Sequence, residues 1–253
     1  QIAMISCVER PPAGSLAAED DGYLQPFGVL QQDLVHFRLR SAWDHLQAVE
    51  VLLSYSSTTT APFAPYTIAR AALVAAATAH WLVDGDADQR RWNAVVIHTR
   101  DVRRDVSFLE TNRAELLRSL KPEQVRSFDE AIETRRSLLR VLDARLDDPQ
   151  PGQIRSFDEK SVVAQAQIVF QNQDQPEPRL EVMYMRLSGV SHALPWASQR
   201  NRRKIADLPN GLERYVHEGD RAEILNCAAA TARVATAAWE HYRDSSEVRI
   251  GPE

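Results

Sequence analysis

Residues 68–77 are apolar on nearly every side of the helix that their composition predicts. A helix without a polar face cannot lie on the surface of a globular protein, so other elements have to surround it. The full apolar segment, 66–83, approaches the ~20 residues that span a bilayer, but Arg70 and His80 lie inside it. We therefore expect a buried central helix and no contact with a membrane.

Apolar residues recur every three or four positions through much of the remaining chain, and each such stripe predicts an amphipathic helix. The stripes cover 27–53, 86–119, 122–147 and 223–242, with shorter apolar segments at 162–170 and 180–196. No segment alternates with the period of two that is typical of a half-buried strand. The nine glycines in 253 residues are about half the usual ~7%, which also favours helices. The predicted fold class is all-α, a multi-helix bundle.

The stripes at 86–119 and 122–147 carry many charges on their outer faces, and Pro122 suits the first turn of the second helix. We expect a long charged helical hairpin at about 86–147, within a single helical domain at 25–245. Residues 1–24 lack periodicity and are expected to form a tail or strap. We expect i, i+4 pairing on each hairpin helix between Arg100, Arg103, Arg104, Arg135 and Arg136 and the acidic Asp101, Asp105, Glu130 and Glu133.

Charge and cysteine content exclude several classes of protein. The net charge of −5 does not favour nucleic acid as a general partner. Cys7 and Cys227 are far apart and show no metal-ligand spacing, so neither a disulfide framework nor a zinc cluster is predicted. Phosphate-binding, dinucleotide-binding, zinc-protease and serine-hydrolase motifs are missing from the sequence. We expect a cytoplasmic protein without a cofactor or metal.

The richest candidate for chemistry lies at 184–196, where Arg186, Ser188 and His192 interrupt an apolar helix. Burying a charged arginine costs several kcal/mol unless it is paired, so Arg186 needs a partner or a role. Ser188 and His192 are one helical turn apart, within reach of a hydrogen bond. Gly189 costs about 1 kcal/mol relative to alanine inside a helix, which indicates close approach of another backbone or a ligand.

The spacing of Arg186 and His192 resembles the Arg-x(4–6)-His motif of the HEPN superfamily. That family comprises small all-α domains, many of them metal-independent ribonucleases of toxin–antitoxin and antiphage systems, whose motifs pair across a homodimer. The resemblance implies an acid–base role for His192, phosphate binding by Arg186 and orientation of the imidazole by Ser188. Active HEPN nucleases usually carry a polar residue where this chain has Leu187. Residues 186–193 also resemble a segment of uncharacterised, mostly actinobacterial all-helical proteins.

A structural interpretation competes with the catalytic one. Arg186 and His192 could form a polar cluster that locks helices together, with Glu50 or Asp44 as the acidic partner.

Arg70 and His80 leave the same choice open. They could line an interior pocket that binds an anion together with Arg186. Alternatively, Arg70 pairs with a buried carboxylate, and His80 caps its helix near Asp84.

Three functions follow from these residues. The favoured one is an interaction or regulatory protein with a HEPN-like helical core, whose charged hairpin contacts a protein partner. The alternatives are a HEPN-like, metal-independent ribonuclease that acts on RNA and a sensor of small anionic ligands. We expect a homodimer. The short basic cluster at 200–204 is interpreted as a solvated loop.

Overall fold

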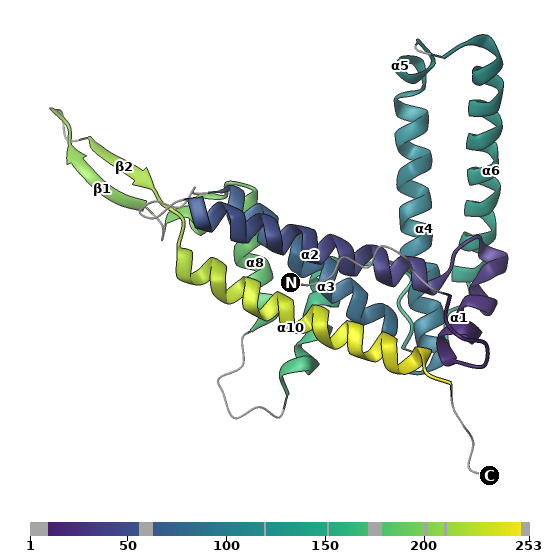
Figure 1. Ribbon diagram of the computed structural model, residues 1–253. Coiled ribbons are helices and arrows are strands. Elements are labelled where there is room, and N and C mark those ends of the chain that lie inside the picture. Colours follow the sequence, from purple (N-terminus) through teal and green to yellow (C-terminus); the bar gives the residue numbers. More distant parts are fainter. Residues whose placement is uncertain are drawn as a thin grey trace. The chain divides into compact units, whose positions relative to one another are not determined.

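The computed structural model describes residues 10–55, 63–118, 120–150, 152–171, 179–199, 202–209 and 212–248. Helices dominate these residues, and their one sheet has two strands, so the all-α fold class is confirmed (Figure 1). The chain divides into two compact units. Unit 1 comprises 1–34, 84–157 and 245–253, and unit 2 comprises 35–83 and 158–244. The single domain expected at 25–245 stays a prediction.

Unit 1 is built from short N-terminal helices and a long helical hairpin. Its elements are α1 (Leu16–Leu24), the 3-10 helix η1 (Gln25–Phe27), α4 (Ala87–Thr111), α5 (Arg113–Arg118) and α6 (Pro122–Leu146). Helix α1 lies inside the expected tail or strap. It forms because the Ser15 hydroxyl accepts the Ala18 N–H at 3.2 Å as an N-cap, and Leu24 is completely buried.

Helices α4 and α6 run antiparallel as the hairpin that the sequence predicts at 86–147 (Figure 1). Five buried residues of α4 have the three–four spacing of a coiled coil: Trp92, Val95, Thr99, Val102 and Val106. Near the start of the helix, at 92–97, every residue is buried. Ile132, Leu142 and Leu146 of α6 are also buried. The Trp92 indole N–H donates to the Ile154 carbonyl at 2.7 Å, which satisfies its polar group inside unit 1.

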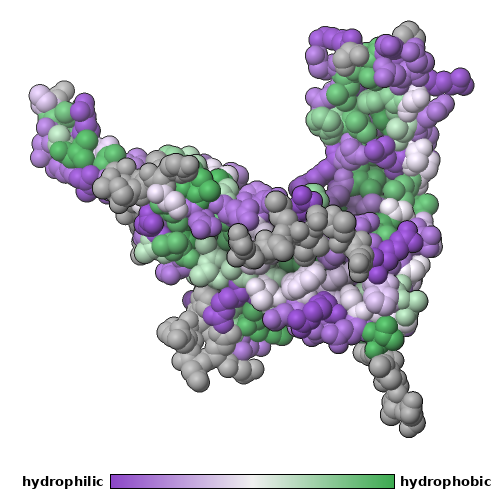
Figure 2. Space-filling view, viewed as in Figure 1, coloured by the Kyte–Doolittle hydropathy of each residue, from purple (hydrophilic) through white to green (hydrophobic). Residues whose placement is uncertain are grey.

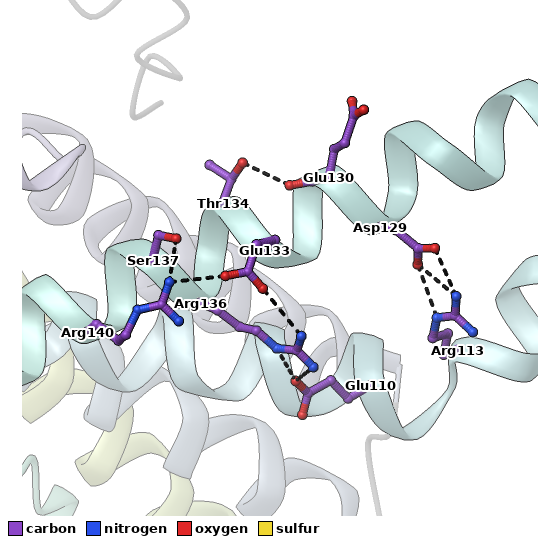
Figure 3. A network of polar contacts seen from close by, with 9 residues as sticks. All are labelled: Glu110, Arg113, Asp129, Glu130, Glu133, Thr134, Arg136, Ser137 and Arg140. Atoms are coloured by element: carbon purple, nitrogen blue, oxygen red, sulfur yellow. Dashed lines mark hydrogen bonds and ion pairs between the residues drawn. The ribbon is translucent and has the colours of Figure 1, made fainter.

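Several arginines of the hairpin form ion pairs with the opposite helix, and Figure 3 shows two of these pairs, Arg113–Asp129 and Arg136–Glu110. The pairs that cross the hairpin join Arg103 to Asp143 at 2.5 Å, Arg113 to Asp129 at 2.9 Å, Arg136 to Glu110 at 2.7 Å, and Arg135 to Asp105. The prediction of i, i+4 pairing is wrong for Arg103 and Arg135, because the antiparallel partner helix presents carboxylates beside the seam. Arg136 pairs across the hairpin and also with Glu133, three residues earlier on its own helix. The side chains of the pairs that cross the hairpin are 42–57% exposed, so each pair alone contributes little to the free energy of folding. Because the pairs join fixed positions on the two sides of the hairpin, together they favour one register.

A buried carboxylate attaches α1 to α4. The Asp20 side chain is 2% exposed and accepts N–H groups from Arg90 at 2.9 Å and from Arg91 at 2.7 Å. Two arginines therefore share one desolvated carboxylate. Removing that carboxylate would leave two cations without their partner in a largely buried position.

Unit 2 surrounds the central helix α3 (Ala64–Val83). Its other elements are α2 (Gln31–Tyr55, from Val35 onward), α7 (Glu159–Gln165), the 3-10 helix η2 (Ala166–Phe170), α8 (Leu180–Ser191), α9 (Pro195–Ser198) and α10 (Arg221–Ser246). Helix α3 packs against α7 and α8. Among the described residues, α3 is the one helix long and apolar enough to cross a membrane, and 72% of that window is buried inside the protein. The prediction of a buried central helix is confirmed.

Unit 2 also contains a β hairpin that the sequence analysis missed. Strands β1 (Arg202–Asp207) and β2 (Glu213–His217) pair antiparallel where a solvated loop was expected at 200–204. Every side chain of the two strands is exposed or half-exposed. Since neither face of the sheet is buried, the sequence needs no alternation of apolar and polar residues here and shows none. The Asn-Gly sequence at 210–211 is the signal that could have revealed the hairpin.

We predict that Asp20→Asn lowers the free energy of unfolding by about 3 kcal/mol, because Arg90 and Arg91 lose their shared buried partner. Urea denaturation followed by circular dichroism measures this change. The exposed Asp148→Asn is the matched control and is expected to change stability by less than about 0.5 kcal/mol. Equal effects of the two substitutions would contradict a structural role for Asp20.

Candidate functional site

Arg186 of α8 is held by a carboxylate in the interior of unit 2. Its side chain is 17% exposed and forms an ion pair with Glu223 in the first turn of α10. The hydroxyl of the fully buried Tyr66 donates to the same Glu223 carboxylate at 2.9 Å and accepts the Asp220 N–H at 3.0 Å. Arg186 is therefore neutralised by a glutamate that α3 also orients.

Arg70 of α3 forms a second cluster of the same composition. It donates to Glu159 of α7 at 2.5 Å and to the Tyr184 hydroxyl of α8 at 3.3 Å, and its guanidinium lies 5.3 Å from the centre of the Tyr184 ring. The Tyr184 hydroxyl donates in turn to Glu159 at 3.3 Å. The sequence left two alternatives for Arg70, an anion pocket or pairing with a carboxylate. In the structure Arg70 pairs with the carboxylate of Glu159.

The two clusters join the helices around α3. Tyr66 and Arg70 are one turn apart on α3, while Tyr184 and Arg186 lie on α8. Each cluster contains one arginine, one glutamate and one tyrosine, so its formal charges cancel. An anionic ligand would have to displace a glutamate from a partly buried ion pair, which leaves that carboxylate uncompensated. The geometry is that of a cross-link between helices.

His192 lies at the end of α8 and not in the interior. It is the exposed C-cap residue, and its backbone N–H donates to the Ser188 carbonyl at 3.0 Å. Ala193 follows with a φ of 52°, and the Leu194 N–H reaches the Gly189 carbonyl at 2.9 Å, which ends the helix. The contact that joins Ser188 to His192 is thus a main-chain bond of the last helical turn.

Gly189 marks the close approach that the sequence predicts, and the neighbour is protein. A Cβ atom at this position would lie 2.6 Å from the Trp196 ring and 2.8 Å from the Ala197 Cβ. Helix α9 therefore packs against the backbone of α8 where any side chain would collide. This accounts for glycine in the last turn of an otherwise regular helix.

His80 does not share a small site with Arg70. Ten residues separate them on α3, which corresponds to about 15 Å at 1.5 Å per residue. The buried His80 ring instead lies 5.5 Å from the His241 ring of α10. Arg70, His80 and Arg186, which were expected to line one anion pocket, therefore do not all lie together.

The sequence analysis missed the acidic partners of both arginines. The suggestion of Glu50 or Asp44 as the partner of Arg186 is wrong: both are exposed on α2, and Arg186 pairs with Glu223. Glu223 lies one turn before the buried Cys227 on α10, so its position on the inward face was the available signal.

Cys227 lies beside this ion pair. Burial and, to a lesser extent, the nearby Glu223 raise the pKa of its thiol to about 12, and Arg186 opposes this shift. The thiol is therefore protonated, and unreactive as a nucleophile, at neutral pH.

No other chemistry is indicated in the described parts of the chain. They contain no group of three or more His, Cys, Asp or Glu side chains arranged to hold a metal ion. An open groove of about 510 Å³ on the hairpin is lined by Glu110, Arg113, Asp129, Ile132, Glu133 and Arg136. Its arginines pair with its own carboxylates (Figure 3), so the groove offers little free charge to a ligand.

Comparison of the chain with known protein families, with curated proteins and with solved structures finds no match. The relationship to the HEPN superfamily therefore stays a prediction that rests on the spacing of Arg186 and His192.

We predict that Gly189→Ala destabilises the protein by about 1–2 kcal/mol, because overpacking against Trp196 outweighs the higher helix propensity of alanine. Gly22 is the matched control: it lies within α1, and a Cβ there meets nothing within 4 Å. Gly22→Ala is expected to raise stability by up to about 1 kcal/mol. Thermal unfolding measures both, and a stabilising Gly189→Ala would contradict the close packing of α9 on α8.

We predict that Cys227 resists Ellman's reagent at pH 8 in the native protein and reacts fully in guanidinium chloride. A Cys7→Ser background isolates the Cys227 signal in a spectrophotometric assay. Rapid labelling of the folded protein would contradict the buried, high-pKa thiol.

Proposed function

We propose that this protein is a non-enzymatic interaction or regulatory protein whose charged α4–α6 hairpin contacts a protein partner. The observation that carries the proposal is the pairing of both interior arginines, Arg70 with Glu159 and Arg186 with Glu223. Arginines engaged in this way stabilise unit 2 and are not free to hold a phosphate. The surface of the hairpin is then the feature of the described chain that still needs a role.

The distal half of the hairpin is built for contact with another protein. No described side chain between 107 and 131 is buried, whereas Val106 and Ile132 at its limits are. Phe108 is 57% exposed, and the exposed Arg104 lies one turn away on the same face of α4. An exposed aromatic beside an arginine is the combination enriched at the centres of protein interfaces.

The charge of the hairpin is not spread evenly. Residues 87–146 contain thirteen basic and ten acidic side chains, a net charge of +3, whereas 107–131 contains four basic and five acidic side chains. The basic excess therefore lies outside the distal half, and the exposed Arg104 lies just before that half begins. Complementary charge steers the encounter between two proteins and selects against wrong partners. We therefore infer a partner with an acidic group that meets Arg104 and an apolar position that receives Phe108.

A HEPN-like ribonuclease is the second candidate, because His192 is exposed and accessible to a substrate. Its Arg186 would first have to leave Glu223. The anion sensor is less well supported, since each of its arginines is balanced by a glutamate.

The enzymatic and non-enzymatic functions differ in their response to substitution. We predict that the purified wild type does not cleave a mixed RNA pool in EDTA. Arg186→Ala should lower the melting temperature by about 4–8 °C, because Glu223 loses its partner, whereas His192→Ala should leave it unchanged. Cleavage by the wild type that both variants abolish, with unchanged melting temperatures, would establish the ribonuclease and overturn the proposal.

The role of the hairpin is tested by affinity capture with the full chain as bait, followed by binding measurements on the purified partner. The double variant Arg104→Glu/Phe108→Glu should bind the partner at least about tenfold more weakly, because it lacks both the positive charge of Arg104 and the apolar contact of Phe108. Ile168→Glu is the matched control, since Ile168 is 50% exposed in unit 2. Equal binding by both variants would contradict recognition through the hairpin.

A further inference from the structure

The β hairpin of unit 2 is a small sheet with unpaired outer edges in the described structure. Its strands pair with each other, extend away from the helices of unit 2 in Figure 1, and bury no side chain. Ile205 is 48% exposed and Leu212 is 59% exposed, and Figure 2 shows apolar surface on this hairpin among hydrophilic atoms. Two strands alone are marginally stable in water, so a sheet of this kind gains from further strands.

One face of the hairpin satisfies its own charges. The Arg202 guanidinium lies 4.1 Å from the centre of the Tyr215 ring. Lys204 pairs with Asp207 at 2.5 Å and with Glu213 at 2.6 Å, and the Tyr215 hydroxyl donates to Glu213. This network holds the two strands in register without help from another molecule.

The opposite face carries one arginine and one apolar residue on each strand. The printed register places Arg203 opposite Val216 and Ala206 opposite Arg214, and Ile205 lies at the irregularity between these pairs. Arg203 is engaged by Glu218 at 2.6 Å. Two strands make only a small sheet face. Pairing with a second hairpin would extend this face, so that its side chains gain neighbours on an adjacent strand.

The two edges of the hairpin differ in their ability to accept a strand. Strand β1 is interrupted by the register shift between Lys204 and Ala206 and carries three consecutive basic residues, and bulges and edge lysines both block strand pairing. Strand β2 is regular from Glu213 to His217 and contains Tyr215 and Val216, which favour strands. The edge of β2 is therefore the open one.

We propose that β2 pairs antiparallel with β2 of a second copy of this chain, about a twofold axis at Tyr215. This register sets Glu213 of one copy opposite His217 of the other and Arg214 opposite Val216, so no like charges meet. An axis at Arg214 would set two arginines opposite each other, which is destabilising. An axis at Val216 would set Arg214 against Glu218, which lies beyond the end of β2, so only residues 215–217 of the strand would be paired. Tyr215 is the central residue of β2, so the axis at Tyr215 pairs the whole strand and brings no like charges together.

The product is a four-stranded antiparallel sheet with the order β1-β2-β2-β1. A twofold axis perpendicular to the sheet keeps the faces with Ala206 and Val216 on the same side in both hairpins, so these two faces become continuous. Strands of five residues bury less area than the 1,200–2,000 Å² of stable interfaces, so the dimer forms with a Kd of about 1 µM or weaker. This surface is separate from the α4–α6 hairpin, and the dimer does not depend on the proposed partner.

Opposite charges at the axis test the proposal on the full-length chain. Tyr215→Lys and Tyr215→Glu each place like charges opposite each other, so each variant alone should dimerise at least about tenfold more weakly than the wild type in sedimentation velocity experiments. A 1:1 mixture pairs lysine with glutamate and should recover the affinity to within about threefold of the wild type. Recovery in the mixture occurs only when residue 215 faces its own copy.

Matched controls separate this edge from others and from misfolding. Ala206→Lys and Ala206→Glu introduce the same charges on β1 and should leave the dimer affinity unchanged, within about threefold. Circular dichroism should show the same helix content for all variants, since the hairpin contributes no buried side chain. A monomeric wild type up to about 300 µM, or a dimer that the Tyr215 variants do not weaken, would overturn the proposal.

A disulfide provides the second readout. Directly opposite residues of antiparallel strands are close enough to be bridged, so Tyr215→Cys in a Cys7→Ser background should form a covalent dimer on mild oxidation. Cys227 does not interfere because its thiol is buried and protonated. Arg203→Cys on β1 is the control and should remain monomeric. Equal crosslinking of both variants would contradict pairing through β2.

Discussion

The burial of most of α3 is the constraint on which unit 2 depends. Its apolar residues require neighbours on every side, yet the same helix brings Tyr66 and Arg70 into that interior. Those polar groups need partners that are themselves held in place, and α7, α8 and α10 supply them as Glu159, Tyr184 and Glu223. In this core, apolar packing supplies the stability, and the two ion pairs determine which faces of the helices pack against each other.

Unit 1 applies a different solution to a similar problem. A two-helix hairpin has one seam to bury, and beyond Val106 and Ile132 that seam is only half-covered among the described residues. Cross-helix ion pairs hold the distal part in register at a small gain in free energy. A region stabilised in this way retains exposed apolar and basic groups, which is what recognition of another protein requires.

Both proposals concern surfaces because the half-buried arginines that suggested chemistry are already paired. The arginines that suggested phosphate chemistry are neutralised by glutamates, and the unusual glycine in α8 accommodates Trp196 of α9. The α4–α6 hairpin and the β hairpin are two of the places where the described chain exposes large apolar side chains. One surface suits an acidic partner, and the other suits a second copy.

Local patterns in the sequence determined most of the helical segments, that most of 66–83 is buried, that 86–147 is a hairpin and that Gly189 meets a close neighbour. These properties depend on periodicity and residue size, which a linear sequence contains. The local patterns missed α1 (Leu16–Leu24), which lies where a tail or strap was expected. The tertiary structure alone decided which glutamate pairs with each arginine, that the hairpin ion pairs cross between helices, and that 202–217 forms strands. Glu159 lies 89 residues from Arg70, and Glu223 lies 37 residues after Arg186. Pairing over such separations is set by how helices pack, and no local pattern encodes it.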